Sequence, residues 1–300
     1  MLALLLLSLF GALPTLARHP LGDTLGGFFK AIYSNEGVDY FPPGVIHPNL
    51  TYTENNVVYP IGTTPLWKHA VERPVENEFN GWWNGYFDHL NQQGVSIGTL
   101  FLEGVPVIYA ARIRMRGNVL IEAEVQLVKD DVEGAQGYRA VANDSWSNAM
   151  GPDFEEDVSD PTALHPMEKR LSWDKMMDLM GRYYAGGEVD TTGFYKDCYR
   201  VNNGRPSLSC ATMPGVVAAS RARGRGRRYA VSGFVEMDRQ AVFSFATVDV
   251  DGRSWLVAES LRFNKLEKID RIEASWTEVP YGSEAPFVQP VRPPGSEDWE

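Results

Sequence analysis

The sequence contains few of the residues that metal and redox sites use. Its 300 residues include two cysteines and five histidines, and no CxxC pair or mixed Cys/His cluster has the spacing of a metal site. A glycine-rich phosphate loop and a dinucleotide-binding fingerprint are also missing. We therefore predict that the protein uses neither a metal nor an organic cofactor.

Positive charge and long apolar segments are scarce as well. The chain has 39 acidic and 28 basic residues, a net charge of −11, which argues against a nucleic-acid partner. After residue 17, no segment approaches the roughly 20 apolar residues that span a bilayer. Residues 1–17 carry no charge, are rich in leucine and end in Thr15-Leu16-Ala17. They predict a secretory signal peptide, and a retained N-terminal anchor is the alternative.

Two further features agree with secretion or residence in the lumen of the secretory pathway. Asn49 and Asn143 each begin an N-glycosylation triplet. Cys198 and Cys210 form an even pair, and in an oxidising compartment such a pair favours a disulfide over a reactive dithiol.

An internal repeat divides the chain. Residues 120–128 read LIEAEVQLV and residues 269–282 read IDRIEASWTEVPYG, so that Glu124 aligns with Glu273 and Leu127 with Trp276. Each segment ends a similar series of an amphipathic helix, a strand with an asparagine pair and long strands, which indicates two copies of one unit. The boundaries that we predict are a signal peptide at 1–17, a first domain at 18–130, an acidic linker at 131–170, a second domain at 171–285 and a disordered tail at 286–300.

Hydrophobic periodicity predicts the elements of each unit. The first unit has helices at 23–34 and 65–71, and Ser172 caps the main helix of the second unit. The predicted strands lie at 50–55, 96–102, 105–115, 119–128, 198–203, 229–236, 241–249, 255–263 and 269–279.

Several short motifs, taken in order, resemble one known family. They include Tyr52-Thr53-Glu54-Asn55-Asn56, Arg112-Ile113-Arg114, Cys198-Tyr199-Arg200 with Asn202-Asn203-Gly204, and Ile272-Glu273-Ala274 with Pro280-Tyr281-Gly282. Their order and spacing resemble tandem NTF2-like (SnoaL/ketosteroid-isomerase-like) proteins that carry a domain of unknown function. The resemblance implies an α+β fold of two tandem NTF2-like cone domains, each a curved antiparallel sheet wrapped on helices. The chain departs from the family at Asn202, which aligns with Glu54 although the family usually has Glu in both copies. If this Glu is catalytic, only the first half would be competent.

The strongest catalytic candidates are Glu54, Tyr52 and His69. A carboxylate inside an apolar cone becomes a plausible base or acid near neutral pH, because burial disfavours its charged form. His69, on the predicted short helix, would relay the proton. The alternative is that Glu54 bonds to the backbone at the end of its strand and that His69 is a surface residue.

A second set of candidates would bind the ligand. Aromatic residues would line the mouth of the cone, with ordinary core packing as the alternative, and the polar members come from the motifs above. The predicted binding residues are Trp67, Trp82, Trp83, Arg112, Arg200 and Asn203.

Two functions of different class follow from the resemblance. The first is a secreted, cofactor-free isomerase or lyase, a cyclase or dehydratase, that acts on a hydrophobic small molecule in natural-product biosynthesis. A dimerising cyclase of the maleidride type belongs to this class. The second is a non-catalytic secreted protein that binds a small molecule or serves as a scaffold. The sequence leaves the substrate open, and also whether copies of the chain associate.

Overall fold

The computed structural model describes residues 20–33, 37–71, 83–88, 91–130, 135, 170–185, 194–207, 210, 229–236, 240–250, 252–264, 266–281 and 283. The predicted signal peptide and C-terminal tail lie outside the described residues, as do Trp82, Asn143 and most of the acidic linker.

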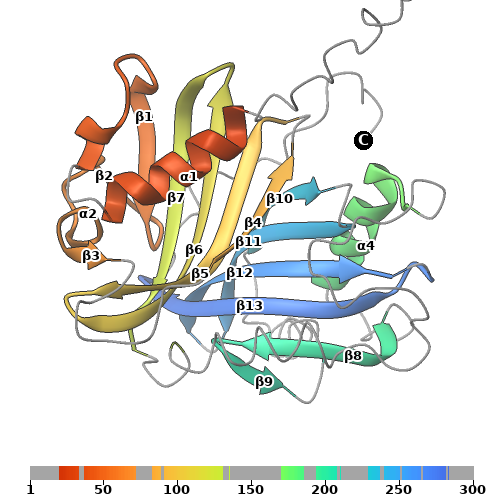
Figure 1. Ribbon diagram of the computed structural model, residues 1–300. Helices are drawn as coiled ribbons and strands as arrows, with labels where there is room; N and C mark the ends of the chain where they lie inside the picture. Colours follow the sequence, from red (N-terminus) through yellow and green to blue (C-terminus); the bar gives the residue numbers. More distant parts are fainter. Residues whose placement is uncertain are drawn as a thin grey trace, which may run out of the picture.

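The first half of the chain forms a seven-stranded sheet with its helices (Figure 1). The helical elements are α1 (Pro20–Tyr33), the 3-10 helix η1 (Gly37–Tyr40) and α2 (Pro65–His69). The strands are β1 (Ile46–Glu54), β2 (Val57–Tyr59), β3 (Ala70–Val71), β4 (Trp83–Asp88), β5 (Gln93–Leu102), β6 (Val105–Arg116) and β7 (Val119–Val128). Their order is β2-β1-β7-β6-β5-β3, and β4 also pairs with β5.

The second half repeats this arrangement. Its described helix is α4 (Trp173–Ala185). Its strands are β8 (Phe194–Asn202), β9 (Arg205–Ser207), β10 (Tyr229–Glu236), β11 (Ala241–Val250), β12 (Arg253–Phe263) and β13 (Ile269–Val279). The order β9-β8-β13-β12-β11-β10 matches the first sheet when β8 takes the place of β1.

Both sheets are mixed rather than purely antiparallel, which corrects the sequence prediction. β1 runs parallel to β7 and β8 runs parallel to β13, whereas the other pairs are antiparallel. The first and last long strands of each unit point the same way, so closing the sheet between them gives a parallel pair. The fold is thus α+β, built from two sheets that are mostly antiparallel.

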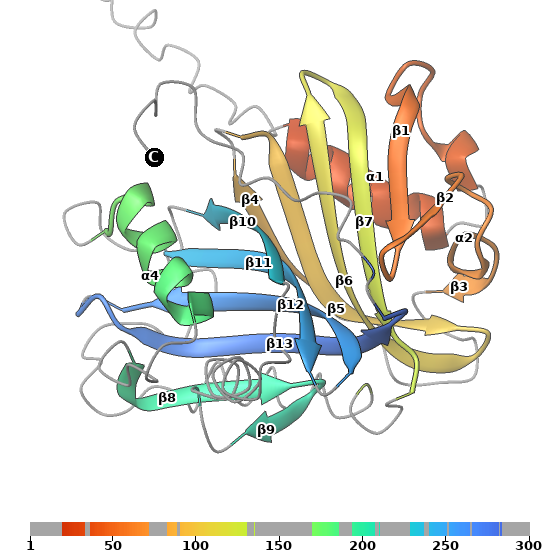
Figure 2. The same ribbon diagram turned by 180° about the vertical axis from the view of Figure 1, so that it is seen from behind.

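The elements stack in four layers. α1 packs on one face of the first sheet (Figure 1), and α4 packs on the far face of the second sheet (Figure 2). The remaining faces of the two sheets meet in a third apolar cluster that contains Val95, Ile97, Phe243 and Phe245. The strands of the two sheets cross at a steep angle (Figure 1), as in orthogonal sheet packing.

Hydrogen bonds also join the two sheets where they meet. Gln126 Nε2 donates to the backbone oxygens of Leu256, at 2.6 Å, and Ser275, at 3.1 Å, and Ser275 Oγ donates to Gln126 Oε1 at 2.6 Å. Gln126 and Ser275 occupy equivalent positions in β7 and β13, so the halves meet like the subunits of a twofold dimer.

An asparagine anchors the parallel pair in each half. Asn55 uses its side chain to bond the N–H and C=O of Leu127, and Asn203 does the same to Trp276, with distances of 2.7–3.1 Å. Both asparagines have positive φ, 48° and 46°, a conformation that asparagine tolerates better than most residues. These contacts confirm the predicted alignment of Leu127 with Trp276.

The helix starts show where local signals worked. α1 begins at Pro20, three residues before the predicted start at residue 23, because proline fits the first turn of a helix. Ser172 precedes α4 as predicted, and the N–H of Lys175 donates to its Oγ at 3.3 Å.

The predicted disulfide is confirmed. Cys198 of β8 bonds to Cys210, with an S–S distance of 2.01 Å and a Cα–Cα distance of 6.1 Å. The bond ties the first strand of the second half to the segment that follows β9.

Candidate functional site

The candidate site lies where β1 ends against the start of α2. Tyr52 and Glu54 are two residues apart on β1, so both point to the face that α1 covers. The Tyr52 and Thr64 hydroxyls both donate hydrogen bonds to Oε1 of Glu54. All three residues are buried, and Glu54 is 7% exposed.

The hydroxyl of Thr64 bonds to Glu54 rather than to the start of α2. Thr64 occupies the N-cap position of α2 but makes no side-chain capping bond, although an N-cap hydroxyl commonly stabilises a helix by about 1 kcal/mol. The hydroxyl goes to Glu54 instead.

The phenol of Tyr52 remains a hydrogen-bond donor over the neutral pH range. Burial and the adjacent negative charge of Glu54 raise the pKa of Tyr52 well above its ordinary value. The ring also packs edge-on against Trp67, with 6.0 Å between the ring centroids. Trp67, a predicted binding residue, is therefore part of the wall around the cluster.

The two oxygens of Glu54 differ. Oε1 accepts both hydroxyl bonds, whereas no residue in the described part of the chain donates to Oε2. Oε2 is therefore the oxygen with capacity to take or release a proton.

The other predicted first-half residues lie apart from this cluster. His69 is exposed at the end of α2, and no hydrogen bond joins it to Glu54. Trp83 lies in β4, where it pairs with Gly98. Asn49 is exposed in the part of β1 where the pairing with β7 is interrupted, as a sequon acceptor needs to be.

Arg112 belongs to a separate polar cluster on the opposite face of the first sheet. Its guanidinium bonds to Gln93 at 2.9 Å, to Glu124 at 3.3 Å and to Glu122 at 3.4 Å. Burial raises the pKa of Glu124, although the charge of Arg112 opposes the shift. Arg112 thus pairs with the buried Glu124 and the half-buried Glu122 beside the contact between the halves.

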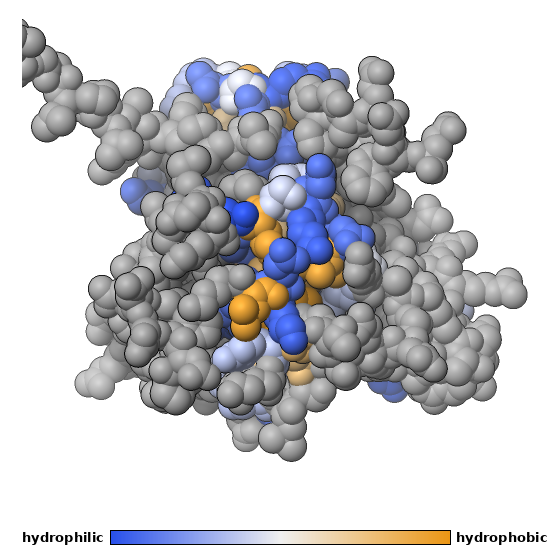
Figure 3. Space-filling model, turned by 90° about the vertical axis from the view of Figure 1, so that its right-hand side faces the viewer, coloured by the Kyte–Doolittle hydropathy of each residue, from blue (hydrophilic) through white to orange (hydrophobic). Residues whose placement is uncertain are grey.

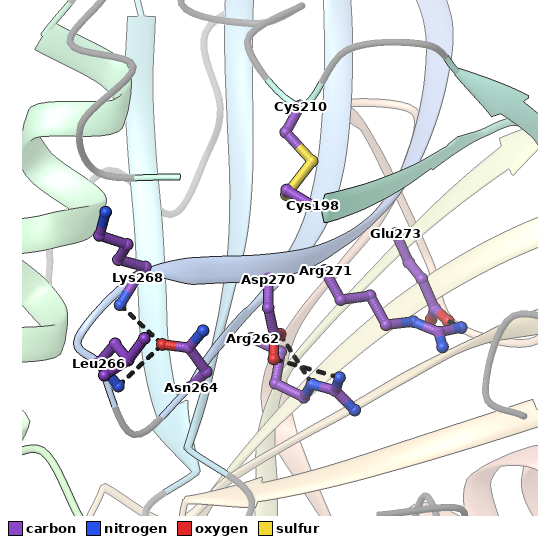
Figure 4. A network of polar contacts seen from close by, with 9 residues as sticks. All are labelled: Cys198, Cys210, Arg262, Asn264, Leu266, Lys268, Asp270, Arg271 and Glu273. Carbon is purple, nitrogen blue, oxygen red and sulfur yellow. Dashed lines mark hydrogen bonds and ion pairs between the residues drawn. A yellow bond between two sulfur atoms is a disulfide. The ribbon is translucent and has the colours of Figure 1, made fainter. Parts of the chain in front are cut away.

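The second sheet carries a related cluster on its corresponding face (Figure 4). Arg262 Nε donates to Asp270 at 3.0 Å, and Arg271 pairs with Glu273. In the adjoining turn, Asn264 Oδ1 accepts from the N–H groups of Leu266, at 2.9 Å, and Lys268, at 3.2 Å. These bonds fix the β12–β13 connection and are structural.

Inside the second half, an ion pair stands where the first half has Tyr52 and Glu54. The alignment of Asn55 with Asn203 places Arg200 at the position of Tyr52 and Asn202 at that of Glu54. Arg200 pairs with Glu259, and both side chains are 0% exposed. Arg200 also donates to Tyr183 Oη at 2.6 Å and to Asn202 Oδ1 at 2.7 Å.

In this second cluster the charge of Arg200 is balanced by the charge of Glu259. Burial opposes the charge of Arg200, but the Tyr183 oxygen and the Glu259 carboxylate outweigh it and raise the pKa of Arg200. Burial raises the pKa of Tyr183 as well, so its hydroxyl remains a donor to Glu259, at 3.0 Å. The predicted binding residues Arg200 and Asn203 thus both bond within the chain.

Sequence reasoning missed Thr64, Tyr183 and Glu259. Thr64 directly precedes Pro65, the first residue of the helix predicted at 65–71, and in the sequence it indicates only the start of that helix. Tyr183 and Glu259 come from α4 and β12, and no sequence spacing links them to Arg200. The alternation of β12 would have placed Glu259 on the buried face with Val257 and Leu261, which was the one usable signal.

Among the described residues, no three His, Cys, Asp or Glu side chains gather as a metal site would need. None of the described helices combines the length and hydrophobicity of a membrane span. Figure 3 shows that, on one side of the molecule, described hydrophobic and hydrophilic side chains are interspersed rather than gathered into one apolar patch.

Comparison with models of known protein families finds no match to this chain. Comparison with curated proteins finds no similar sequence either. The NTF2-like resemblance therefore remains a prediction from the motifs.

Proposed function

We propose that the chain is a secreted tandem NTF2-like protein whose first half is a cofactor-free isomerase or lyase for a hydrophobic small molecule. The observation that carries this proposal is the state of Glu54: Oε1 is held by two hydroxyls, and Oε2 has no described donor. A carboxylate held in this way has a fixed direction and one oxygen with which to move a proton.

In this mechanism, Glu54 Oε2 takes a proton from an activated C–H bond of the substrate and returns it at another position. Tyr52 and Thr64 keep the carboxyl group in place through their bonds to Oε1. They stabilise its negative charge before the first transfer and after the second; between the transfers Glu54 is a neutral acid and the negative charge lies on the substrate. Trp67, edge-on to Tyr52, supplies apolar surface for the substrate. A cyclase of the maleidride type would use the same first step.

The second half would not share the reaction. Its equivalent position holds Asn202, whose Oδ1 accepts from Arg200, and its interior contains a paired Arg–Glu. The disulfide in this half is compatible with the oxidising compartment that secretion provides.

Hydrogen–deuterium exchange at carbon tests the proposal without a known product. The secreted protein is incubated in D₂O with a panel of cyclic enones and alkyl-substituted maleic anhydrides, and deuterium uptake at carbon is followed by mass spectrometry. We expect uptake above the buffer rate for at least one compound, and a fall of about a hundredfold or more in Glu54→Gln.

Asn202→Asp is the matched control, because it adds a carboxylate to the equivalent position of the second half and should leave uptake unchanged. Uptake that persists in Glu54→Gln would remove this residue from the mechanism.

A non-catalytic binding or scaffold role is the second candidate. It is favoured by the 7% exposure of Glu54, because a substrate could reach Oε2 only after neighbouring side chains move. In this case a compound from the panel should raise the melting temperature of the wild type while no deuterium enters it.

A further inference from the structure

A groove lies on the outside of α1, away from the Glu54 cluster. It has a volume of about 390 Å³, and its lining includes Gly26, Gly27, Lys30, Tyr40, Phe41 and Val45. Small-molecule sites commonly measure about 300–1,000 Å³. The groove opens between the outer side of α1 and the segment after η1, whereas Leu25, Phe28 and Phe29 of α1 point into the core.

The floor of the groove is a glycine pair in the middle of a helix. Glycine inside a helix is less favourable than alanine by roughly 1 kcal/mol, so each glycine needs a reason. A Cβ on Gly27 would make ordinary van der Waals contact, at 3.9 Å, with the rings of Tyr40 and Phe41, so the two rings lie directly against this part of the helix. A Cβ on Gly26 would meet nothing within 4 Å, so packing does not explain Gly26, which keeps the floor open.

The walls combine aromatic surface with one cation. Tyr40 and Phe41 are half-buried and meet edge-on, with 6.2 Å between their ring centroids. Lys30, in the last turn of α1, is exposed, and no described carboxylate pairs with it. In a chain with a net charge of −11, an exposed ammonium beside two aromatic rings favours an anion attached to an apolar body.

We propose that this groove is a second binding site, for a flat apolar molecule that carries one carboxylate or sulfonate. The apolar body lies on Gly26 and Gly27 against the rings of Tyr40 and Phe41, and the anionic group lies at Lys30. The site uses neither the residues nor the acid–base chemistry of the Glu54 cluster, so it goes beyond the proposed function.

Two fluorescent probes with the same aromatic body test the site. 1-Anilinonaphthalene-8-sulfonate carries the anion, and N-phenyl-1-naphthylamine lacks it. Titrated against the full-length secreted protein, the sulfonate should bind with a saturable fluorescence increase. Gly26→Leu should weaken this binding at least tenfold, because its side chain fills the groove, while the melting temperature holds or rises since leucine favours the helix over glycine.

Gly181→Leu is the matched control. Gly181 is an exposed glycine of α4 whose Cβ would also meet nothing within 4 Å, so the same substitution should leave probe binding as in the wild type. Lys30→Gln should weaken the sulfonate several-fold and leave the neutral probe unchanged. The proposal is overturned if the wild type gives no saturable signal, if Gly26→Leu binds like the wild type, or if Lys30→Gln affects both probes equally.

Discussion

The two halves have the same strand order but bury different polar side chains. In the first half, Tyr52 donates to Glu54, and one carboxylate oxygen has no described donor. In the second half, the equivalent positions are Arg200 and Asn202, and Arg200 bonds to three side chains at once. The first cluster keeps an unused acceptor, whereas the second neutralises its own charges.

This difference shows that strand order does not decide which polar groups each half buries. The two sheets have equivalent order, parallel pairs and asparagine contacts. The chemistry is set by a few side chains placed on that frame. Two copies of one frame can thus hold a carboxylate oxygen with no described donor in one copy and a buried ion pair in the other.

The largest expected effect comes from breaking the second cluster. Arg200→Met leaves Glu259 buried without its cation and should lower the free energy of unfolding by about 3–5 kcal/mol. Urea denaturation measures the change. The double variant Arg200→Met/Glu259→Leu should recover much of the loss, because neither charge then stays buried alone.

Arg253→Met provides the control for that comparison. The Arg253–Glu278 pair is more than half exposed on both sides, and exposed pairs contribute about 0–1 kcal/mol. If Arg200→Met lowers the free energy of unfolding by no more than Arg253→Met does, the buried Arg200–Glu259 pair does not stabilise the second half as proposed.

The disulfide is the next contrast, since both cysteines lie in the second half. Replacing Cys198 and Cys210 by serine should lower the unfolding free energy by roughly 3 kcal/mol, the entropy of a loop of this size. Dithiothreitol should lower the melting temperature of the wild type and leave the double serine variant unaffected. A double variant as stable as the oxidised wild type would show that the bond constrains little.

The asparagine contacts should instead behave alike in both halves. Asn55→Ala and Asn203→Ala each remove two backbone-directed hydrogen bonds and force alanine to a positive φ. We expect losses of roughly 1–3 kcal/mol for each. Asn55→Gly and Asn203→Gly keep the backbone unstrained and isolate the hydrogen-bond part. Strongly unequal losses would mean that the two halves are not equivalent at this joint.

The correspondence between the two halves is the long-range feature that the sequence predicts best. The alignment of the two last strands gives Leu127 and Trp276 equivalent positions in the two halves, and the asparagine contacts confirm it. β7, β10 and β13 have the predicted bounds, because alternation of apolar residues on a half-buried strand is a strong local signal. Tyr52 and Glu54 were paired correctly for the same reason.

The missed features depend on contacts that no local pattern encodes. β4 was not predicted because its glycine and asparagine disfavour strands, yet pairing with β5 holds it. Thr64 signalled only a helix start, and its bond to Glu54 required the fold to bring α2 to β1. The parallel pairs were missed because nothing local records strand direction.

The smallest effect concerns Glu124, on the face where the halves meet. Burial raises the pKa of its carboxyl. At a pH between the ordinary and the raised pKa, Glu124 is therefore protonated in the folded chain and ionised in the unfolded chain. The stability that this proton provides is present below the ordinary glutamate pKa, about 4.3, and is lost as the pH rises toward the raised value. The slope from one such group is at most about 1.4 kcal/mol per pH unit. Glu124→Gln should therefore flatten the fall in stability above pH 4.3, measured by urea denaturation at a series of pH values. Glu278→Gln, at an exposed pair, should leave the slope as in the wild type. If the wild type and Glu124→Gln lose stability in parallel over this range, Glu124 does not hold the extra proton.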